Sequence, residues 1–304
     1  MNNFMMGLAL LLLNLLWWQG AQGQDVQGKS AQAQIAVTDN VGREVVLAQP
    51  AQRIISLAPH VTENLFSAGA GEQVVGVVDY SNYPKAATQV PSVGSFVQLN
   101  LEAIVALNPD LVVAWHSGHG DMKLQSLLDL GLTVYVSDPR DLETVAVNIE
   151  NFGTLSGHHN QALQAAQAFR LELSRLRQQY SQLAPVGVFY QVWNNPLQTL
   201  NGSHLISDVI RLCGGYNVFA DAIAIAPKLA VESVLAANPQ AIVASGMGEA
   251  RPDWLDEWLQ WPSLQAVQGN HLYFIPPDYV QRHTVRILLG ADMLCRQLQQ
   301  VRSQ

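Results

Sequence analysis

Short apolar runs rich in β-branched residues recur along the chain. Each has the length of a buried strand, and stretches with apolar residues at helical spacing separate them. The runs are RIISLA (53–58), VVGVV (74–78), DLVVAW (110–115), TVYVS (133–137), VGVFYQVW (186–193), AIVAS (241–245) and LYFI (272–275). Because strands and helices alternate, the pattern predicts an α/β fold in which mainly parallel sheets are flanked by helices and joined by right-handed crossovers.

One long segment in the middle of the chain has a different pattern. Residues 158–183 are rich in Ala, Leu, Gln and Arg and contain no Gly or Pro. This composition favours a single helix, which at ~1.5 Å per residue would span roughly 35–40 Å. We therefore expect one long rigid α-helix that joins an N-terminal α/β lobe at 35–157 to a C-terminal α/β lobe at 184–304.

Two distant segments repeat the same pattern. NLEAIVALNPDLVVAW (100–115) and AVESVLAANPQAIVAS (230–245) each place a glutamate early in an apolar helix, followed by Asn-Pro and a β-branched run. The unit occurs once in each predicted lobe, so Glu102 and Glu232 stand at matching places. A carboxylate near a helix N-terminus also interacts favourably with the helix dipole. This local effect is the alternative to a functional role as the reason why a glutamate stands at both places.

Composition and charge limit the class of protein. The chain has 304 residues, of which 49% are hydrophobic and only 13% are charged, as is typical of a well-buried globular interior. The formal net charge is −8. Nucleic acids and anionic lipid surfaces both favour basic patches, so we expect neither as a partner.

The first 23 residues predict a secretory signal. An apolar run is followed by small residues, with Ala21 and Gly23 at the −3 and −1 positions of a cleavage site before Gln24. Residues 24–34 are polar and unpatterned, which predicts a flexible tail. An uncleaved membrane anchor is the alternative, although the apolar run is short for a membrane span. We expect the mature chain to be soluble outside the cytoplasm.

Export changes the interpretation of Cys213 and Cys295, the only two cysteines. An oxidising compartment favours a disulfide between them, and two buried free thiols are the alternative. Closing a loop of about 80 residues would stabilise the fold by roughly 4–5 kcal/mol in the chain-entropy account. Both cysteines lie in the second predicted lobe, so the bond would connect two parts of that lobe.

Aromatic and polar side chains follow several of the strand-like runs. In open parallel sheets, ligands bind beyond the carboxyl ends of the strands. The residues at these ends are Asp79, Tyr80, Tyr83, Trp115, His116, Trp193, Asp278, Tyr279 and Arg282. Large flat side chains suit a large, flat, partly apolar ligand, and ordinary loop packing is the alternative for any one of them. Because several occur at equivalent places, we expect a ligand in a cleft between the lobes.

Several stretches of sequence together resemble one family. They are RIISLAPHVTE (53–63), DYSNYP (79–84), LNLEAIVALNPDLVVAW (99–115), LCGGYNVF (212–219) and VESVLAANPQAIV (231–243). They look like the periplasmic binding proteins of ABC importers for cobalamin, in the wider class that also carries siderophores and haem. The resemblance covers nearly the whole mature chain in the same order. It implies two α/β lobes joined by a long helix, a ligand held between them with little lobe closure, and neither enzymatic activity nor a catalytic cofactor.

The resemblance also implies roles for individual residues. Tyr80 and Trp115 match aromatic contacts to the ligand, and Asp278 and Arg282 match polar ones. The family disulfide matches the two cysteines of this chain, and the family location is the periplasm.

Two aromatic positions depart from the family pattern. Phe96 stands where the resemblance implies a tryptophan, and Ala226 stands near the place of another. We include Phe96 among the ligand contacts, and we expect Trp193 to replace some of the lost stacking surface. The chemistry at Phe96, Ala226 and His116 is what would distinguish a corrinoid from haem or an iron–siderophore.

Partners follow from the same resemblance. In the family, two glutamates project from the lobe tips and pair with arginines on the two membrane subunits, and Glu102 and Glu232 match them. A pseudo-symmetric protein that meets a dimeric permease needs one such contact per lobe. We expect a cobalamin-like ligand, an ABC permease dimer with its ATPase subunits, and a monomer when the protein is free. The sequence has no phosphate-binding loop, so ATP hydrolysis would belong to a partner.

Two other functions stay open at this point, a binding protein for haem or an iron–siderophore and, more distantly, an exported metal-dependent hydrolase. HSGHGD places His116, His119 and Asp121 at a spacing that suits a metal, although we expect solvated loop histidines there. His116 beside Trp115 would be a candidate ligand to a haem iron. Residues 201–208 contain Ser, His and Asp, but sequence neighbours rarely form a catalytic triad. We therefore predict no catalytic residue. We also predict no bound metal.

Overall fold

Two four-stranded parallel sheets form the centre of the computed structural model, which describes residues 34–95, 97–246, 248 and 250–303. The first sheet has the order β4-β3-β5-β6 and the second has the order β10-β9-β7-β8. Their strands are β3 (Ile54–Ser56), β4 (Val74–Val77), β5 (Leu111–Trp115), β6 (Val134–Ser137), β7 (Val186–Gln191), β8 (Gly215–Asn217), β9 (Ala241–Ala244) and β10 (Leu272–Phe274). Every pairing within the two sheets is parallel, which confirms the predicted α/β class.

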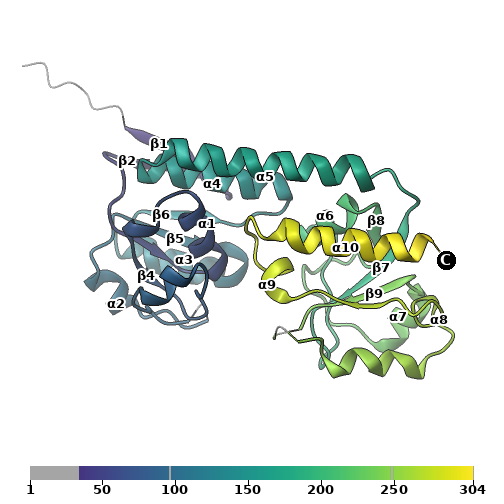
Figure 1. The fold of residues 1–304 in the computed structure, drawn as a ribbon. Helices are drawn as coiled ribbons and strands as arrows, with labels where there is room; N and C mark the ends of the chain where they lie inside the picture. Colours follow the sequence, from purple (N-terminus) through teal and green to yellow (C-terminus); the bar gives the residue numbers. More distant parts are fainter. Residues whose placement is uncertain (1–33, 96, 247, 249, 304) are drawn as a thin grey trace, which may run out of the picture. The chain divides into compact units, whose positions relative to one another are not determined.

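Helices flank both sheets, and we call the parts of the chain around the first and second sheets the first and the second lobe (Figure 1). The α-helices are α1 (Pro59–Ser67), α2 (Leu101–Ala106), α3 (His116–Asp129), α4 (Leu142–Ser156), α5 (His159–Tyr180), α6 (Leu205–Leu212), α7 (Val231–Ala237), α8 (Gln265–Gln268), α9 (Pro277–Val280) and α10 (Ile287–Arg302). The 3-10 helices in the described part of the chain are η1 (Gly71–Gln73), η2 (Lys85–Gln89) and η3 (Asp253–Gln260). Within the described ranges, every helix is too short or too polar to cross a bilayer.

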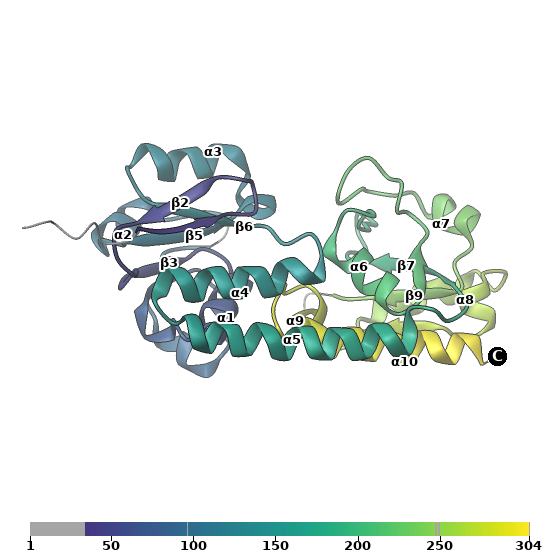
Figure 2. The ribbon, with the colours of Figure 1, turned by 90° about the horizontal axis from the view of Figure 1, so that it is seen from above.

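Helix α5 lies beside α4 and α10, as two perpendicular views show (Figures 1 and 2). Its buried residues follow one another at spacings of three and four, which places them on one face of the helix. They are Ala162, Ala166, Phe169, Leu173, Leu176 and Tyr180. The helix falls inside the segment 158–183, where the sequence predicts one. That it acts as a rigid strut between domains at 35–157 and 184–304 stays a prediction, and residues 1–23 and most of 24–34 lie outside the described residues.

The hydrophobic core is continuous from the first sheet to the second. One cluster of buried side chains includes Ile54 of β3, Phe152 of α4, Phe169 of α5 and Tyr190 of β7. Separate clusters cover the opposite face of each sheet, around Ile104 in the first lobe and around Phe189 and Trp258 in the second. Both sheets accordingly belong to one compact unit of the chain, residues 34–304.

Three short strands were not predicted from the sequence. β1 (Ile35–Thr38) and β2 (Glu44–Leu47) form an antiparallel hairpin, and the third is β8. The hairpin turn depends on Asp39, whose carboxylate accepts hydrogen bonds from the backbone N–H of Val41 and Arg43. β8 reads Gly-Tyr-Asn, which is too short and too polar to resemble a buried strand.

The repeated sequence pattern occupies the same topological place in both sheets. In each sheet the first strand lies between the second and the third, and the repeat supplies the helix that precedes the third strand, α2 before β5 and α7 before β9. Asn108 and Asn238 adopt left-handed φ angles of 45° and 43° where these helices end. Asparagine tolerates this conformation, and the following proline cannot continue a helix. The Asn-Pro pair therefore turns the chain from helix to strand in both lobes.

A disulfide joins Cys213, at the end of α6, to Cys295 within α10. Both cysteines are fully buried. The bond confirms the predicted pairing and closes a loop with a sequence separation of 82 residues. It connects two helices that contact each other and cover the second sheet.

Replacing both cysteines by alanine should lower the free energy of unfolding by about 4–5 kcal/mol, because the unfolded chain regains the entropy of the open loop. Urea unfolding of wild type and of the double variant at neutral pH measures the difference. As a matched control, wild type unfolded in the presence of dithiothreitol should show the same loss. An unchanged midpoint in the double variant would contradict the prediction.

Candidate ligand site

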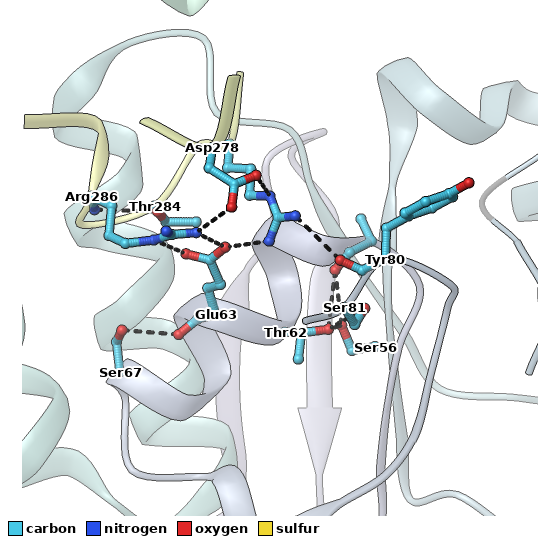
Figure 3. Close-up of polar contacts among 11 residues, drawn as sticks. Ser56, Thr62, Glu63, Ser67, Tyr80, Ser81, Asp278, Thr284 and Arg286 are labelled. Carbon is cyan, nitrogen blue, oxygen red and sulfur yellow. Dashed lines mark hydrogen bonds and ion pairs between the residues drawn. The ribbon is translucent and has the colours of Figure 1, made fainter. Parts of the chain in front are cut away.

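A buried carboxylate joins α1 of the first lobe to the segment that precedes α10 in the second. Glu63 is only 1% exposed. Its oxygens accept hydrogen bonds from Arg282 Nη1 at 2.8 Å, Arg286 Nε at 2.9 Å and Arg286 Nη2 at 2.6 Å (Figure 3). The carboxylate of Asp278, in the first turn of α9, lies 3.0 Å from Arg282 Nε and 3.6 Å from Arg286 Nη2. These four side chains, which we call the four-charge cluster, balance two positive charges with two negative ones.

The electrostatics of Arg286 show how the cluster is held together. Burial opposes the charge of its guanidinium, but the hydrogen bonds and the charge of Glu63, with a further contribution from Asp278, outweigh burial and raise the pKa of Arg286 above its usual range. Hydrogen bonds between charged partners are roughly twice as strong as neutral ones. The pairing across the lobes therefore keeps the arginine charged although most of its side chain is buried.

The loop after β4 approaches the four-charge cluster from another side. Arg282 Nη2 donates to the backbone oxygen of Tyr80 at 3.3 Å, and the Arg286 guanidinium carbon lies 4.0 Å from the centre of the Tyr83 ring. Tyr80 has a φ angle of 65°, a left-handed conformation that is uncommon for tyrosine. The residue is 76% exposed, and its ring points away from the cluster (Figure 3). The strained backbone thus presents an aromatic face to solvent next to paired charges.

Trp115 belongs to the same region through a group of histidines. Its ring lies 5.2 Å from the ring of His60 in α1 and 6.4 Å from that of His283, both measured between centroids. His283 contacts His60 at 5.4 Å and His204 at 5.4 Å. His283 directly follows Arg282, so the aromatic contacts of Trp115 lead to the four-charge cluster.

The three histidines, His60, His204 and His283, are neutral at neutral pH. Burial lowers the pKa of His60 to about 3, opposed by the charge of Asp138. Burial, with help from the charge of Arg140, lowers the pKa of His204 to about 4. Burial and the neighbouring histidines lower the pKa of His283 well below its usual range.

Of the six predicted ligand contacts, the structure joins Tyr80 and Asp278 to Arg282, and Trp115 lies beside His283, the residue after Arg282. Trp193 follows β7 in a different loop, where its Nε1 donates to the backbone oxygen of Asn195 at 2.9 Å. Phe96 lies outside the described residues.

The site also contains residues that the sequence analysis did not select. They are His60, Glu63, His204, His283 and Arg286. The first two lie within the string RIISLAPHVTE that carries the family resemblance, but the arginine partners of Glu63 come more than 200 residues later. Arg282 and Arg286 lie in the irregular segment between α9 and α10, so no helical or strand periodicity in the sequence marks their pairing with Glu63.

One weaker prediction is corrected by the structure. His116 and His119 lie in α3 rather than in a solvated loop, and His119 is buried. His119 Nδ1 accepts a hydrogen bond from the backbone N–H of Trp115, and burial lowers the pKa of His119 to about 4. Across the described ranges, no group of three or more His, Cys, Asp or Glu side chains is arranged to hold a metal ion.

The Ser, His and Asp of residues 201–208 bond to different partners. Ser203 Oγ donates to Asn201, His204 Nδ1 accepts from the backbone of its own helix start, and Asp208 accepts from the backbone N–H of Leu142. A hydrolytic triad needs the base to face the nucleophile. This arrangement does not provide that contact.

Glu102 and Glu232 are both exposed, each in the first turn of its helix, α2 and α7. The side chain of Asn100 caps α2 by accepting from the backbone N–H of Ala103 at 3.0 Å, whereas α7 has no side-chain cap. A carboxylate in the first turn stabilises a helix only modestly. Matching exposure in the two lobes leaves both glutamates open to a partner.

The chain is similar to known proteins in both sequence and structure. The family model for periplasmic binding proteins matches residues 54–279. The vitamin B12-binding protein of Vibrio cholerae serotype O1 is 38% identical over 250 residues, covering 82% of this chain and 90% of that protein. The solved structure of the periplasmic vitamin B12 binding protein BtuF of Vibrio cholerae has a TM-score of 0.78 and 37% identity over 84% of this chain and 99% of that one.

A relative with a different ligand shares the fold. The periplasmic haem-binding protein RhuT from Roseiflexus sp. RS-1 matches with a TM-score of 0.70 and 23% identity, covering 81% of this chain and 97% of that one. At this level of identity the similarity shows the fold alone. The same fold thus occurs in proteins whose names give different ligands, and a fold by itself does not identify a ligand.

The buried histidines make stability depend on pH. Unfolded histidines take up protons near pH 6.5, whereas folded His60 stays neutral until about pH 3 and folded His204 until about pH 4. The unfolded state binds more protons in this window, so stability is present above about pH 6.5 and is lost as the pH falls toward the folded pKa values. Replacing His60 by Phe keeps a ring in the same place and removes one of the histidines that take up a proton on unfolding.

Between about pH 7.5 and about pH 5, the free energy of unfolding should fall for both proteins. We expect it to fall by about 2 kcal/mol less for His60→Phe than for wild type. Urea unfolding at several pH values measures the slope. Leu171→Phe, at an exposed position of α5, adds a ring without changing a titratable group, so it is the control and should keep the wild-type slope. Equal slopes for His60→Phe and wild type would show that this histidine is not protonated differently on unfolding.

Proposed function

The chain belongs to the periplasmic binding protein family, and from that premise we propose that it captures cobalamin or a related corrinoid and delivers it to an ABC importer. Members of this family bind and deliver ligands, so the chain acts as a binding protein and not as an enzyme. Its family and its relatives support a periplasmic location, and we propose that residues 1–23 are removed during export.

The observation that supports a corrinoid is the meeting of aromatic and polar residues from both lobes. Trp115 and Tyr80 come from the first lobe, while Asp278 and Arg282 come from the second. A corrin ring is flat and partly apolar, and it carries amide side chains. Aromatic rings would stack on its apolar faces, and the carboxylate and guanidinium would bond to its amides. Phe96 and Trp193 are proposed to extend the stacking surface.

Purified mature protein should bind cyanocobalamin with one-to-one stoichiometry in calorimetry or tryptophan fluorescence. Trp115→Ala should weaken binding by roughly tenfold or more, since buried aromatic contacts are among the residues that dominate binding energy. Leu171→Ala, at an exposed position of α5, is the control and should bind like wild type. Haemin and a ferric siderophore are the comparators. Binding of either one in place of cyanocobalamin would assign a different ligand to the site.

The two exposed glutamates are proposed to dock the loaded protein on the permease dimer. Glu102 and Glu232 occupy equivalent places in two lobes of the same topology, so a two-fold symmetric partner would meet the same charge twice. Negative charges that face arginines of the permease would mainly guide and orient the encounter. The free protein is proposed to be a monomer, and the ATPase subunits of the importer would supply the energy.

The double variant Glu102→Lys/Glu232→Lys should lose cobalamin uptake in cells while the purified protein keeps its affinity for cyanocobalamin, because both changes lie outside the ligand site. Uptake of labelled cobalamin and calorimetry measure the two properties separately. Glu44→Lys, an exposed acid in β2, is the matched control for the charge change. Wild-type uptake by the double variant would exclude docking through these residues.

A further inference from the structure

The four-charge cluster is neutralised before any ligand arrives. Each nitrogen of the Arg282 guanidinium has a partner, Asp278 for Nε, Glu63 for Nη1 and the Tyr80 backbone oxygen for Nη2. Arg286 uses Nε and Nη2 on Glu63. Arginine stays charged under all ordinary conditions, so the two carboxylates decide the charge that this part of the site shows to a ligand.

Burial divides the four members into two kinds. The side chains of Arg282 and Arg286 are 13% exposed and that of Asp278 is 26% exposed, whereas Glu63 is 1% exposed. Glu63 lies behind the two arginines, out of reach of solvent. It acts on a ligand only through the arginines that it holds and neutralises.

This arrangement distinguishes ligands by their charge. An arginine without a carboxylate partner binds a ligand carboxylate in bidentate fashion, which is among the strongest polar contacts available. Here Glu63 already fills that role on Arg286, and Asp278 would repel an incoming anion. A neutral ligand with amide groups avoids both costs, because its N–H groups can donate to Asp278 and its carbonyl groups can accept from guanidinium hydrogens that remain available.

We propose that Glu63 determines specificity by neutralising Arg282 and Arg286, so that the site accepts a neutral, amide-bearing macrocycle and disfavours one that carries carboxylates. The inference rests on the proposed function and names the chemical class of its ligand. A purely structural role for Glu63 would make a different prediction. Loss of the bridge between the lobes would then weaken every ligand alike, whereas loss of charge balance changes the ratio between neutral and anionic ligands.

The test measures the affinity of Glu63→Gln for cyanocobalamin, which is neutral, and for haemin, which carries two carboxylates. The substitution leaves one positive charge unbalanced beside the ligand. We expect the ratio of the two affinities to shift toward haemin by about tenfold or more, and the shift to shrink as ionic strength rises. An unchanged ratio, or an equal loss for both ligands, would overturn the proposal.

Two further variants separate charge from structure. Glu63→Gln/Arg286→Gln removes one charge of each sign and restores balance, so the gain toward haemin should disappear. A gain that persists in this double variant would contradict a charge mechanism. Glu72→Gln removes an exposed carboxylate of the first lobe outside the cluster, and it should keep the wild-type ratio.

A buried charge is costly to leave without its partner, so Glu63→Gln is open to folding defects. Asp278→Asn removes the other carboxylate from a less buried position and should shift the ratio in the same direction. An unchanged ratio in Asp278→Asn would also overturn the proposal. The binding of cyanocobalamin by wild type distinguishes a failure of the proposed function from a failure of the inference about Glu63. If it binds no cyanocobalamin, the proposed function fails together with this inference, whereas if it binds and the variants show no shift, only the inference fails.

Discussion

A carboxylate that is only 1% exposed has to be neutralised where it lies, and Glu63 imposes that requirement on the region between the lobes. An ionised group buried without a partner costs several kcal/mol. Arg282 and Arg286 meet the requirement from a segment 219 and 223 residues later in the chain. Because Arg282 also holds the Tyr80 backbone, the loop after β4, helix α1 and the segment before α10 are fixed relative to one another. Together with the hydrogen bond from Asn64 Nδ2 to the backbone oxygen of His283 and the core that the lobes share, this pairing sets the geometry of the candidate site.

The duplication of topology explains why the exposed features of the two lobes match. Each sheet has the same strand order, and the same helix, Asn-Pro turn and strand recur within it. After the turn, the backbone N–H of Asp110 and that of Gln240 each bond to a carbonyl near the start of the first strand of their own sheet. The helix before the third strand is therefore held in the same way in each lobe. An acid in the first turn of that helix is carried to an equivalent surface, which is what a two-fold symmetric partner would recognise.

Much of the fold could be predicted because its signals are local. β-Branched runs mark the longer parallel strands, and a stretch rich in Ala, Leu, Gln and Arg without Gly or Pro marks α5. The disulfide could be predicted because only two cysteines are present. The site could be predicted only in part, since Tyr80, Trp115 and Arg282 stand at strand ends or in a family motif. The pairing of Glu63 with Arg286 depends on how two lobes meet, and no periodicity within either segment reports it.

Neutrality extends beyond the ion pairs. His60, His204 and His283 lie beside Trp115 or beside each other, and burial keeps them uncharged at neutral pH. The region therefore offers aromatic rings and paired charges, while the chain as a whole carries a formal net charge of −8. Such a chain repels anions over its surface and gains little from electrostatic steering of a neutral ligand. Capture then has to rely on apolar contact and on hydrogen bonds to dipoles, and both require side chains that are already held in place when the ligand arrives.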